Sequence, residues 1–450
     1  MSTQKQLHIG VFLQGVGHSI AWRHPDHAKF TEFETYVRFA QTAERGKLDF
    51  IFFGEGLVVR EHRDKIFGQI VNGRPDTLAL LPALAAVTTH VGLAATISST
   101  YNEPYELARQ LASIDHVSNG RAAWNVVTTF SNSIAKDSGG DQVAFNFSRD
   151  RHLDHATRYD RAREFVALIK SLWDSWEDDA FVDGVVDSRK VHSLDHQGEW
   201  FTVAGPLDVP RSPQGHPVII QAGQSEDGRD LAARIADVIF SPHRNFDDSK
   251  AHYDDVKQRM VKYGRNPDQL RLLPGLAVIA APTTGEAKEK AAYYRELLLT
   301  DDIIRYLLGE QSGLDFHNID LDGPLPALDT TNPAANVPLI EKWQQQAQEQ
   351  KLTVRQVADL IMPRTPLAGS PVQIADHFQH WLTAGASDGF LLTPTLFPND
   401  LDNFVDLVVP ELQNRGLFRT EYTGTTLREN LGVERPTSPW LAAHYDYSLA

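Results

Sequence analysis

The stretch that decides the fold is residues 96–129, TISSTYNEPYELARQLASIDHVSNGRAAWNVVTT. Its pattern is typical of a strand, a polar turn, a helix, a glycine turn and a second strand. Pro104 suits the first helical position, because the N–H that proline lacks would have no partner there. Gly120 supplies the positive φ that many helix ends need. We therefore expect a β-α-β unit over this stretch.

Polar side chains stand where each of these two strands stops. The first strand closes with Thr96, Ser98, Ser99 and Thr100, and the second closes with Asn125, Thr128 and Thr129. In a barrel of alternating strands and helices, the ends of the strands form the active face. The stretch therefore predicts functional side chains from two neighbouring strands at one rim.

Short apolar runs alternate with amphipathic segments along the rest of the chain. We expect eight strands, at 7–13, 49–55, 91–98, 121–128, 217–223, 237–242, 272–281 and 388–394. The expected helices lie near 32–46, 77–88, 104–118, 154–176, 226–236, 247–263, 285–299, 371–384 and 400–415. Eight strands, each followed by a helix, predict an α/β fold of the closed (β/α)8 TIM barrel type.

An open, doubly wound sheet is the competing fold. Such a sheet usually carries a glycine-rich phosphate loop directly after its first strand. Here the first strand is followed by GVG at 15–17, which lacks the third glycine and the immediate helix. The closed barrel is therefore the better interpretation.

The chain is expected to form a single barrel domain over 1–450 with two insertions and a tail. Residues 177–216 contain QGEWFTVAGPLDV, which is typical of a hairpin. Residues 300–370 contain a Pro-rich irregular stretch followed by a polar helix at 340–350. Long loops in a compact domain often act as lids. The tail, 417–450, is punctuated by Gly and Pro, and we expect it to wrap a neighbouring subunit.

Composition narrows the possible partners. The 450 residues carry 43 Lys and Arg against 59 Asp and Glu, a net charge of −16, which disfavours nucleic acid and anionic membranes. The chain has no cysteine, so disulfides, thiolate metal sites and cysteine nucleophiles are excluded. No apolar run approaches the roughly 20 residues that span a bilayer, and the N-terminus has no signal-peptide pattern. We expect a cytoplasmic protein.

Several single residues suggest chemistry at the rim. Glu55 ends the second strand, where a carboxylate suits binding or acid–base work, although an ordinary loop carboxylate is an equal reading. His155 and Tyr159 share a helix face, and both can donate to an anion or to a ring system. His152 and His155 are three apart, but no further ligand cluster has suitable spacing, so we expect no metal site.

The turn QAGQSEDG at 221–228 predicts a phosphate site. It contains Gln221, Gly223, Ser225 and Gly228 between the fifth strand and its helix. Small residues let a backbone approach a ligand closely, and a helix N-terminus presents free N–H groups to an anion. Ordinary helix capping by Ser225 is the alternative.

Aromatic residues near the rim suggest walls for a substrate. His18, Trp22 and His24 follow the first strand, and Phe53 ends the second. Packing beneath a loop is an equal reading for Trp22. No GxSxG nucleophile elbow is present, although the composition leaves a Ser-His-Asp triad open, and a metal-dependent barrel hydrolase is a remote option.

With these motifs in view, the chain resembles the bacterial luciferase-like flavin monooxygenases. Within them it is similar to the nitrilotriacetate, dibenzothiophene-sulfone and long-chain-alkane monooxygenase branch. The matching blocks are AWRHP (21–25), TISSTYNEPYELAR (96–109), GRAAWNVVTT (120–129), HATRYDRAREF (155–165), WDSWEDDA (173–180), HQGEWFTVAGPLDVPRSPQGHPVIIQAG (196–223) and RTEYTGTTLRENLG (419–432). They span nearly the whole chain.

The resemblance implies a monooxygenase that uses FMN, as FMNH2, and O2 to insert one oxygen atom into a small organic substrate. A separate NAD(P)H:flavin reductase would supply the FMNH2, and the enzyme would form a homodimer or homotetramer. The implied cofactor contacts are Glu55, Thr96, Asn125, Thr129, His155, Tyr159, Gln221, Gly223 and Ser225. Glu55 stands where relatives usually have Asp, which shifts its reach.

The resemblance also assigns catalytic and substrate roles. His18, Asn125 and His155 are the expected catalytic residues, and His18, Trp22 and Phe53 are expected to face substrate. Donors from Asn125 and His155 would stabilise charge on an electron-rich reduced flavin. The 300–370 insertion would act as a lid that keeps the site dry.

The substrate and two other functions stay open at this point. FFGEGL (52–57) and the tail make the sulfone-cleaving type the nearest overall pattern, with C–S cleavage, C–N cleavage or hydroxylation as possible outcomes. A hydride-transfer oxidoreductase that uses a deazaflavin or a flavin is one alternative. A non-catalytic flavin-binding protein is the other.

Overall fold

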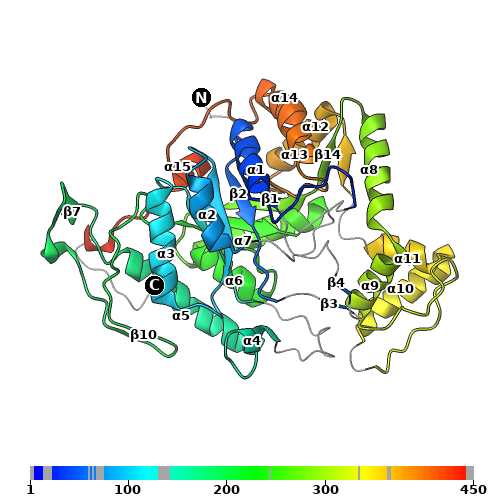
Figure 1. Ribbon diagram of the computed structural model, residues 1–450, viewed down its shortest axis with the longest axis horizontal. Coiled ribbons are helices and arrows are strands. Elements are labelled where there is room, and N and C mark those ends of the chain that lie inside the picture. Colours follow the sequence, from blue (N-terminus) through cyan, green and yellow to red (C-terminus); the bar gives the residue numbers. More distant parts are fainter. Residues whose placement is uncertain are drawn as a thin grey trace.

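Eight parallel strands close into a barrel in the computed structural model (Figure 1). The structure describes residues 5–13, 23–58, 61–62, 65–66, 75–129, 142–242, 245–332, 335–361 and 366–441. The barrel strands are β1 His8–Leu13, β2 Phe50–Phe53, β5 Gly92–Ser98, β6 Ala122–Val127, β11 Val218–Gln221, β12 Val238–Ser241, β13 Arg271–Leu276 and β16 Gly389–Leu392. Each is paired in parallel with both neighbours, in the order β1-β16-β13-β12-β11-β6-β5-β2. The predicted TIM barrel is confirmed.

Helices cover the outside of this barrel where the periodicity predicts them. They are α1 Phe33–Arg45, α2 Thr77–Ala85, α3 Pro104–Val117, α5 His155–Trp173, α6 Glu226–Ile235, α7 Phe246–Lys262, α8 Thr284–Leu298 and α12 Pro371–Thr383. The last predicted helix is built from α13 Asn399–Asn403, a π-helical turn Phe404–Val408 and α14 Val409–Asn414. A short helix, α4 Gln142–Asn146, precedes α5. As expected, Pro104 begins α3, and Gly120 has φ 83°.

Alternate residues of each strand face opposite sides of the barrel wall. Phe12 and Phe52 point inward with Phe240, and their ring centroids lie 4.4 Å (Phe12–Phe52) and 5.7 Å (Phe12–Phe240) apart. Phe53 points outward, 5.8 Å from Phe39 of α1 and in the outer core. The expected substrate role of Phe53 is therefore wrong, because the interior face of β2 belongs to Phe52.

Residues 177–216 form two antiparallel ribbons that project from the barrel, at the left of Figure 1. In one ribbon, β7 Phe181–Val182 pairs with β8 Val185–Val186. In the other, β9 His196–Gln197 pairs with β10 Thr202–Val203, within the stretch predicted as a hairpin. A third ribbon, β3 Glu61–His62 with β4 Lys65–Ile66, follows β2.

Residues 300–370 contain more helix than we expected. The polar helix is present as α10 Val337–Gln350, but α9 Asp301–Ser312 and α11 Val354–Ile361 accompany it. Apolar side chains of all three helices meet around the buried Trp343 in a small core of their own. Beside this insertion, β14 Val278–Ala280 pairs with β15 Leu367–Gly369 and leads the chain back to the barrel.

The described part of the tail covers the amino end of its own barrel. Helix α15 Leu427–Leu431 places Leu427 and Leu431 in the interior core with Phe50. Residues 417–441 close the barrel from which they come, and the expected contact of the tail with a neighbouring subunit stays a prediction. No helix among the described residues is long and apolar enough to span a membrane.

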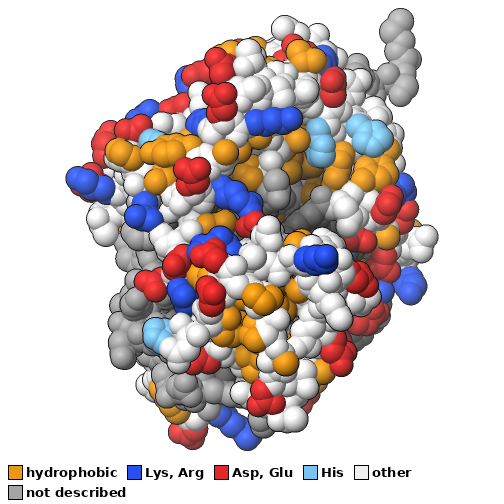
Figure 2. Space-filling view, turned by 90° about the vertical axis from the view of Figure 1, so that its right-hand side faces the viewer, with side chains coloured by type: hydrophobic (Ala, Val, Ile, Leu, Met, Phe, Trp, Pro, Cys, Tyr) orange, Lys and Arg blue, Asp and Glu red, His pale blue; other side chains and the backbone are white. Residues whose placement is uncertain are grey.

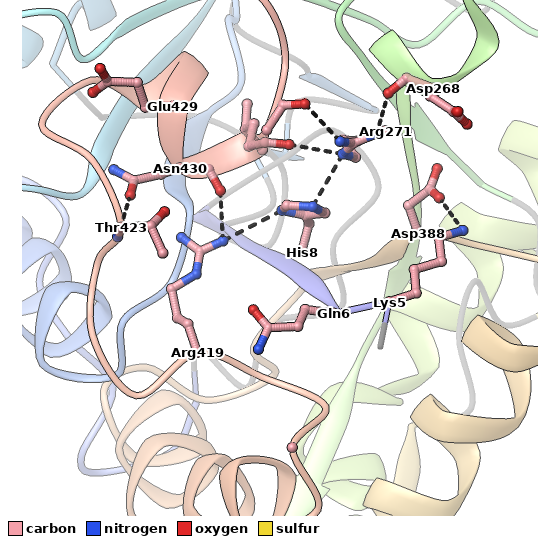
Figure 3. Close-up of a pocket in the computed structure, with 13 residues that line it drawn as sticks. Lys5, Gln6, His8, Asp268, Arg271, Asp388, Arg419, Thr423, Glu429 and Asn430 are labelled. Carbon is pink, nitrogen blue, oxygen red and sulfur yellow. Dashed lines mark hydrogen bonds and ion pairs between the residues drawn. The ribbon is translucent and has the colours of Figure 1, made fainter. Parts of the chain in front are cut away.

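Ion pairs join this tail to the first strands. Arg419 donates to the Oδ1 atom of the buried Asp49 at 2.5 Å, and His8 Nδ1 lies 3.0 Å from the same oxygen. Burial alone would raise the pKa of Asp49, but Arg419 and His8 outweigh it and hold that pKa below its usual range. Figure 3 shows His8, Arg271 and Arg419 around a pocket of about 730 Å³ at this end.

Candidate active site at the carboxyl end of the barrel

Thr96 and Asn125 lie side by side at the carboxyl ends of β5 and β6, as the pattern predicts. The two residues are register partners, and Asn125 Nδ2 donates to Thr96 Oγ1 at 3.0 Å. Both residues are buried. The Oδ1 atom of Asn125 has no hydrogen-bond partner among the described residues. A buried polar atom without a partner costs about 1–3 kcal/mol, so this oxygen is suited to receive a donor from a ligand.

A pair of hydroxyls extends this polar rim. Ser98 Oγ and Thr129 Oγ1 are 2.5 Å apart. Thr129 has φ 51°, a left-handed conformation that β-branched residues rarely adopt. The Arg158 guanidinium holds it there, because Nη1 donates to the carbonyl oxygens of Thr128 at 3.0 Å and Thr129 at 2.8 Å. Burial lowers the pKa of Arg158.

The first turns of α5 and α6 form a small cradle. Ser225 caps α6, as predicted, by accepting a hydrogen bond from the N–H of Gly228 at 3.1 Å. Ser225 Oγ also donates to the Tyr159 hydroxyl at 3.5 Å. Tyr159 in turn lies beside His155, with 4.8 Å between the ring centroids. The structure therefore brings together three of the residues expected to bind the cofactor.

Glycines let two backbone segments of this cradle approach each other closely. A Cβ atom at Gly228 would lie 2.8 Å from the Cα atom of Gly223 and 3.1 Å from the Tyr159 hydroxyl. The backbone N–H of Gly223 donates to Gln221 Oε1 at 2.6 Å, which fixes the turn after β11. The cradle thus combines a hydroxyl pair with a helix N-terminus, an arrangement that suits a phosphate group.

His155 occupies a more open position than its expected catalytic role suggests. It is the first residue of α5, its side chain is 51% exposed, and its Nδ1 atom lies 3.4 Å from a carboxylate oxygen of Asp227. This position favours contact with a ligand at the edge of the cradle. Glu55 is half-buried in the loop after β2. His18 and Trp22 lie outside the described residues.

The structure adds residues that sequence reasoning missed. Thr393 follows β16, is buried, and its hydroxyl has no partner among the described residues. Thr393 could have been found from the sequence, because it is a polar residue at the end of the eighth strand, and the same criterion selected Thr96. The Tyr101 hydroxyl lies 2.5 Å from His152 Nδ1, and their rings stack. These two residues are 51 positions apart in the sequence, so no local pattern indicates that they meet.

One side of the molecule is visibly hollowed. Figure 2 looks onto the side that carries α8 to α11, and hydrophobic and basic side chains border a hollow there. Within the described ranges, no group of three or more His, Asp or Glu side chains is placed to hold a metal ion.

Taken together, the fold and the site define an α/β barrel with unpartnered buried polar atoms, and a cradle suited to a phosphate group, at its carboxyl end. The family comparison agrees with this class. The model of the luciferase-like monooxygenases matches residues 14–388, and the chain belongs to this family. It is accordingly a flavin-dependent monooxygenase.

Curated relatives match along the full chain. N-acetyl-S-(2-succino)cysteine monooxygenase of Bacillus subtilis (strain 168) is 42% identical, over 97% of this chain and 99% of the relative. Nitrilotriacetate monooxygenase component A of Aminobacter aminovorans is also 42% identical, over 97% and 98%. Dibenzothiophene-sulfone monooxygenase of Rhodococcus erythropolis (strain XP) is 38% identical, over 97% and 98%. The sulfone-cleaving type is therefore not the nearest pattern, contrary to our expectation.

Solved structures share the whole architecture. A riboflavin lyase with modified FMN and riboflavin as substrate has a TM-score of 0.80 and 30% identity, covering 96% of this chain and 97% of its own. The long-chain alkane monooxygenase LadA has a TM-score of 0.79 and 32% identity, covering 95% and 96%. Both similarities extend across the insertions as well as the barrel.

Proposed function

We propose that this chain is the oxygenase of a two-component system, which receives FMNH2 from a separate NAD(P)H:flavin reductase and oxidises a small organic substrate with O2. The observation that carries the proposal is the buried, unpartnered Oδ1 atom of Asn125 beside Thr96 at the barrel mouth. A relative named as component A of a monooxygenase supports the two-component arrangement. We also propose a homodimer or homotetramer.

The residues present fit FMN. Ser225, Tyr159 and His155, with the backbone between Gly223 and Gly228, would hold the phosphate. When bound, reduced FMN supplies the activation of O2 and the transfer of one oxygen atom.

The rim would hold the flavin ring. The unpartnered carbonyl oxygen of Asn125 would accept a hydrogen bond from a ring N–H, and Thr96 fixes the orientation of the amide. Ser98 and Thr129 would border the ring, in positions held by Arg158. Glu55 and Gln221 are proposed as further cofactor contacts. These side chains would bind and orient the cofactor. Catalytic roles would consist of donating to charge that develops during the reaction, from the second amide N–H of Asn125 and from the ring N–H of His155.

The interior aromatic residues favour an aromatic or aliphatic substrate. Phe12, Phe52 and Phe240 form an apolar wall inside the barrel. His18 and Trp22 are proposed to face the substrate from the segment after β1. The insertion with α9, α10 and α11 would act as a lid that excludes water from the mouth.

The test is an oxygen-uptake assay with purified protein, FMN, NADH and a general flavin reductase. The substrate panel contains a long-chain alkane, dibenzothiophene sulfone, nitrilotriacetate and N-acetyl-S-(2-succino)cysteine. We expect tight binding of FMNH2, and O2 uptake with formation of an oxygenated product for one substrate class. Turnover that persists without O2 would establish hydride transfer instead. Flavin binding with no turnover of any kind would favour a flavin-binding protein.

A further inference from the structure

A second cavity, of about 540 Å³, lies between the last turns of α5 and α6 and the tail segment 434–439. It is formed by the far ends of the same two helices whose first turns make the cradle. Six of its lining side chains are Lys or Arg and three are Asp or Glu, so it carries a formal excess of three positive charges. This excess stands out in a chain with a net charge of −16.

Most of these cations already have carboxylate partners. Arg428 forms two hydrogen bonds with Asp237, at 2.7 and 3.2 Å. Arg265 has no carboxylate partner among the described residues, but it donates to the carbonyl oxygens of Ala233 at 2.9 Å and Ala236 at 2.7 Å. Both guanidinium groups are thereby fixed at the wall of the cavity.

Lys170 differs from these arginines because its charged group has neither a carboxylate nor a carbonyl partner among the described residues. It lies in the last turn of α5, lines the cavity and is partly buried, yet no hydrogen bond or ion pair of its ammonium group is found within the described residues. Burial lowers the pKa of Lys170 to about 8; Arg265 and Arg428 add to the lowering, whereas Asp237 and Asp174 act in the opposite direction. A partly buried cation that has no direct partner and lies near two guanidinium groups is suited to share an anion with them.

We propose that this cavity binds a small-molecule oxyanion, a phosphate or carboxylate group, with Lys170 as its principal contact and Arg265 beside it. The volume falls in the range of small-molecule sites. The flavin cradle lies at the opposite ends of the same helices, so the proposal is independent of the function proposed above.

Inorganic phosphate is the probe, and the reactivity of the Lys170 amine is the readout. The wild-type protein is treated with an amine-acetylating reagent at neutral pH, with and without millimolar phosphate, and modification is measured peptide by peptide. Lys288, an exposed residue of α8, serves as the internal reference. We expect phosphate to slow acetylation of Lys170 several-fold and to leave Lys288 unchanged.

Calorimetric titration with phosphate then compares variants. Lys170→Met is expected to weaken binding about tenfold, as loss of one charge-assisted hydrogen bond predicts. Lys170→Arg, which keeps the charge, and Lys288→Met are expected to bind as the wild type does. Phosphate bound in the cradle near Ser225 would leave Lys170 acetylation unchanged. That result, or equal affinity in Lys170→Met, would overturn the proposal.

Discussion

The two ends of the barrel differ in whether their buried polar groups have hydrogen-bond partners. At the amino end, Asp49 is surrounded by Arg419, His8 and the N–H of Ile9. At the carboxyl end, the amide oxygen of Asn125 and the hydroxyl of Thr393 have no partner among the described residues. The amino end has exceptions of its own among the described residues, including one guanidinium nitrogen of Arg419 and the hydroxyl of Ser387, which precedes β16. Paired groups at one end stabilise the fold, and unpaired groups at the other are available to a ligand.

The largest expected effect on stability comes from removing the ion pair between Arg419 and Asp49 at the amino end. Arg419→Met leaves Asp49 buried beside an uncharged side chain, and we expect it to lower the free energy of unfolding by about 3–5 kcal/mol. Urea unfolding followed by fluorescence measures the change. Arg38→Met is the matched control, because its pair with Asp402 is exposed and is worth roughly 0–1 kcal/mol. Equal midpoints for the two variants would contradict the contrast.

The same change, asparagine to alanine, can be made at each end of the barrel and the two variants compared. Asn430 at the amino end accepts from the N–H groups of Thr423 and Gly424, both at 3.1 Å, and donates to two carbonyl oxygens. We expect Asn430→Ala to lower the free energy of unfolding by about 1–3 kcal/mol and to leave FMNH2 affinity unchanged.

Asn125→Ala should affect FMNH2 affinity rather than stability. It is expected to weaken FMNH2 binding about tenfold, or ~1.4 kcal/mol, with little loss of stability, because one of its polar atoms is unpaired before any ligand binds. Anaerobic titration measures the affinity, and urea unfolding measures the stability. If Asn125→Ala destabilised the fold as Asn430→Ala does, the distinction between the ends would be lost.

Lys170 is an unpaired exception toward the amino end, and its effect depends on pH. Its pKa is about 8 in the folded protein against an ordinary 10.5. The unfolded chain therefore binds more protons between these values, and wild-type stability rises with pH across that window. We expect Lys170→Met to raise the free energy of unfolding by roughly 1–2 kcal/mol at pH 7, with the gain fading by pH 10.5. A gain that does not vary with pH would contradict this origin.

The smallest effect is expected at the cradle. Tyr159→Phe removes the hydroxyl that accepts from Ser225, and FMN affinity should fall several-fold, or about 0.5–1.5 kcal/mol. Riboflavin, which has no phosphate, is the matched ligand, and its affinity should be unchanged. Quenching of flavin fluorescence measures both. An equal loss for the two ligands would place Tyr159 against the ring rather than the phosphate.

The sequence predicted the barrel well because its evidence is local. Each strand is an apolar run, and caps such as Ser225 or Pro104 act within one turn of their helix. The same locality explains why the rim residues of β5 and β6 were found: polar residues follow directly after apolar ones. These signals need no knowledge of which segments meet in space.

What escaped prediction depends on contacts across the chain. The run FIFF at 50–53 is buried on both faces, so its pattern does not tell which phenylalanine faces inward. Helices α9 and α11 acquire their apolar partners only when they surround Trp343. The pair between Asp49 and Arg419 spans 370 residues and leaves no periodic trace.

That pairing has a consequence for synthesis on the ribosome. Asp49 emerges with the first strands, whereas the guanidinium that neutralises it is translated 370 residues later. Until then the base of the nascent barrel is open, and only His8 and the N–H of Ile9 can contact the Asp49 carboxylate. Chains that terminate before Arg419 therefore carry every barrel strand and still lack the guanidinium that stabilises the buried carboxylate, so we expect them to be less stable than the full chain.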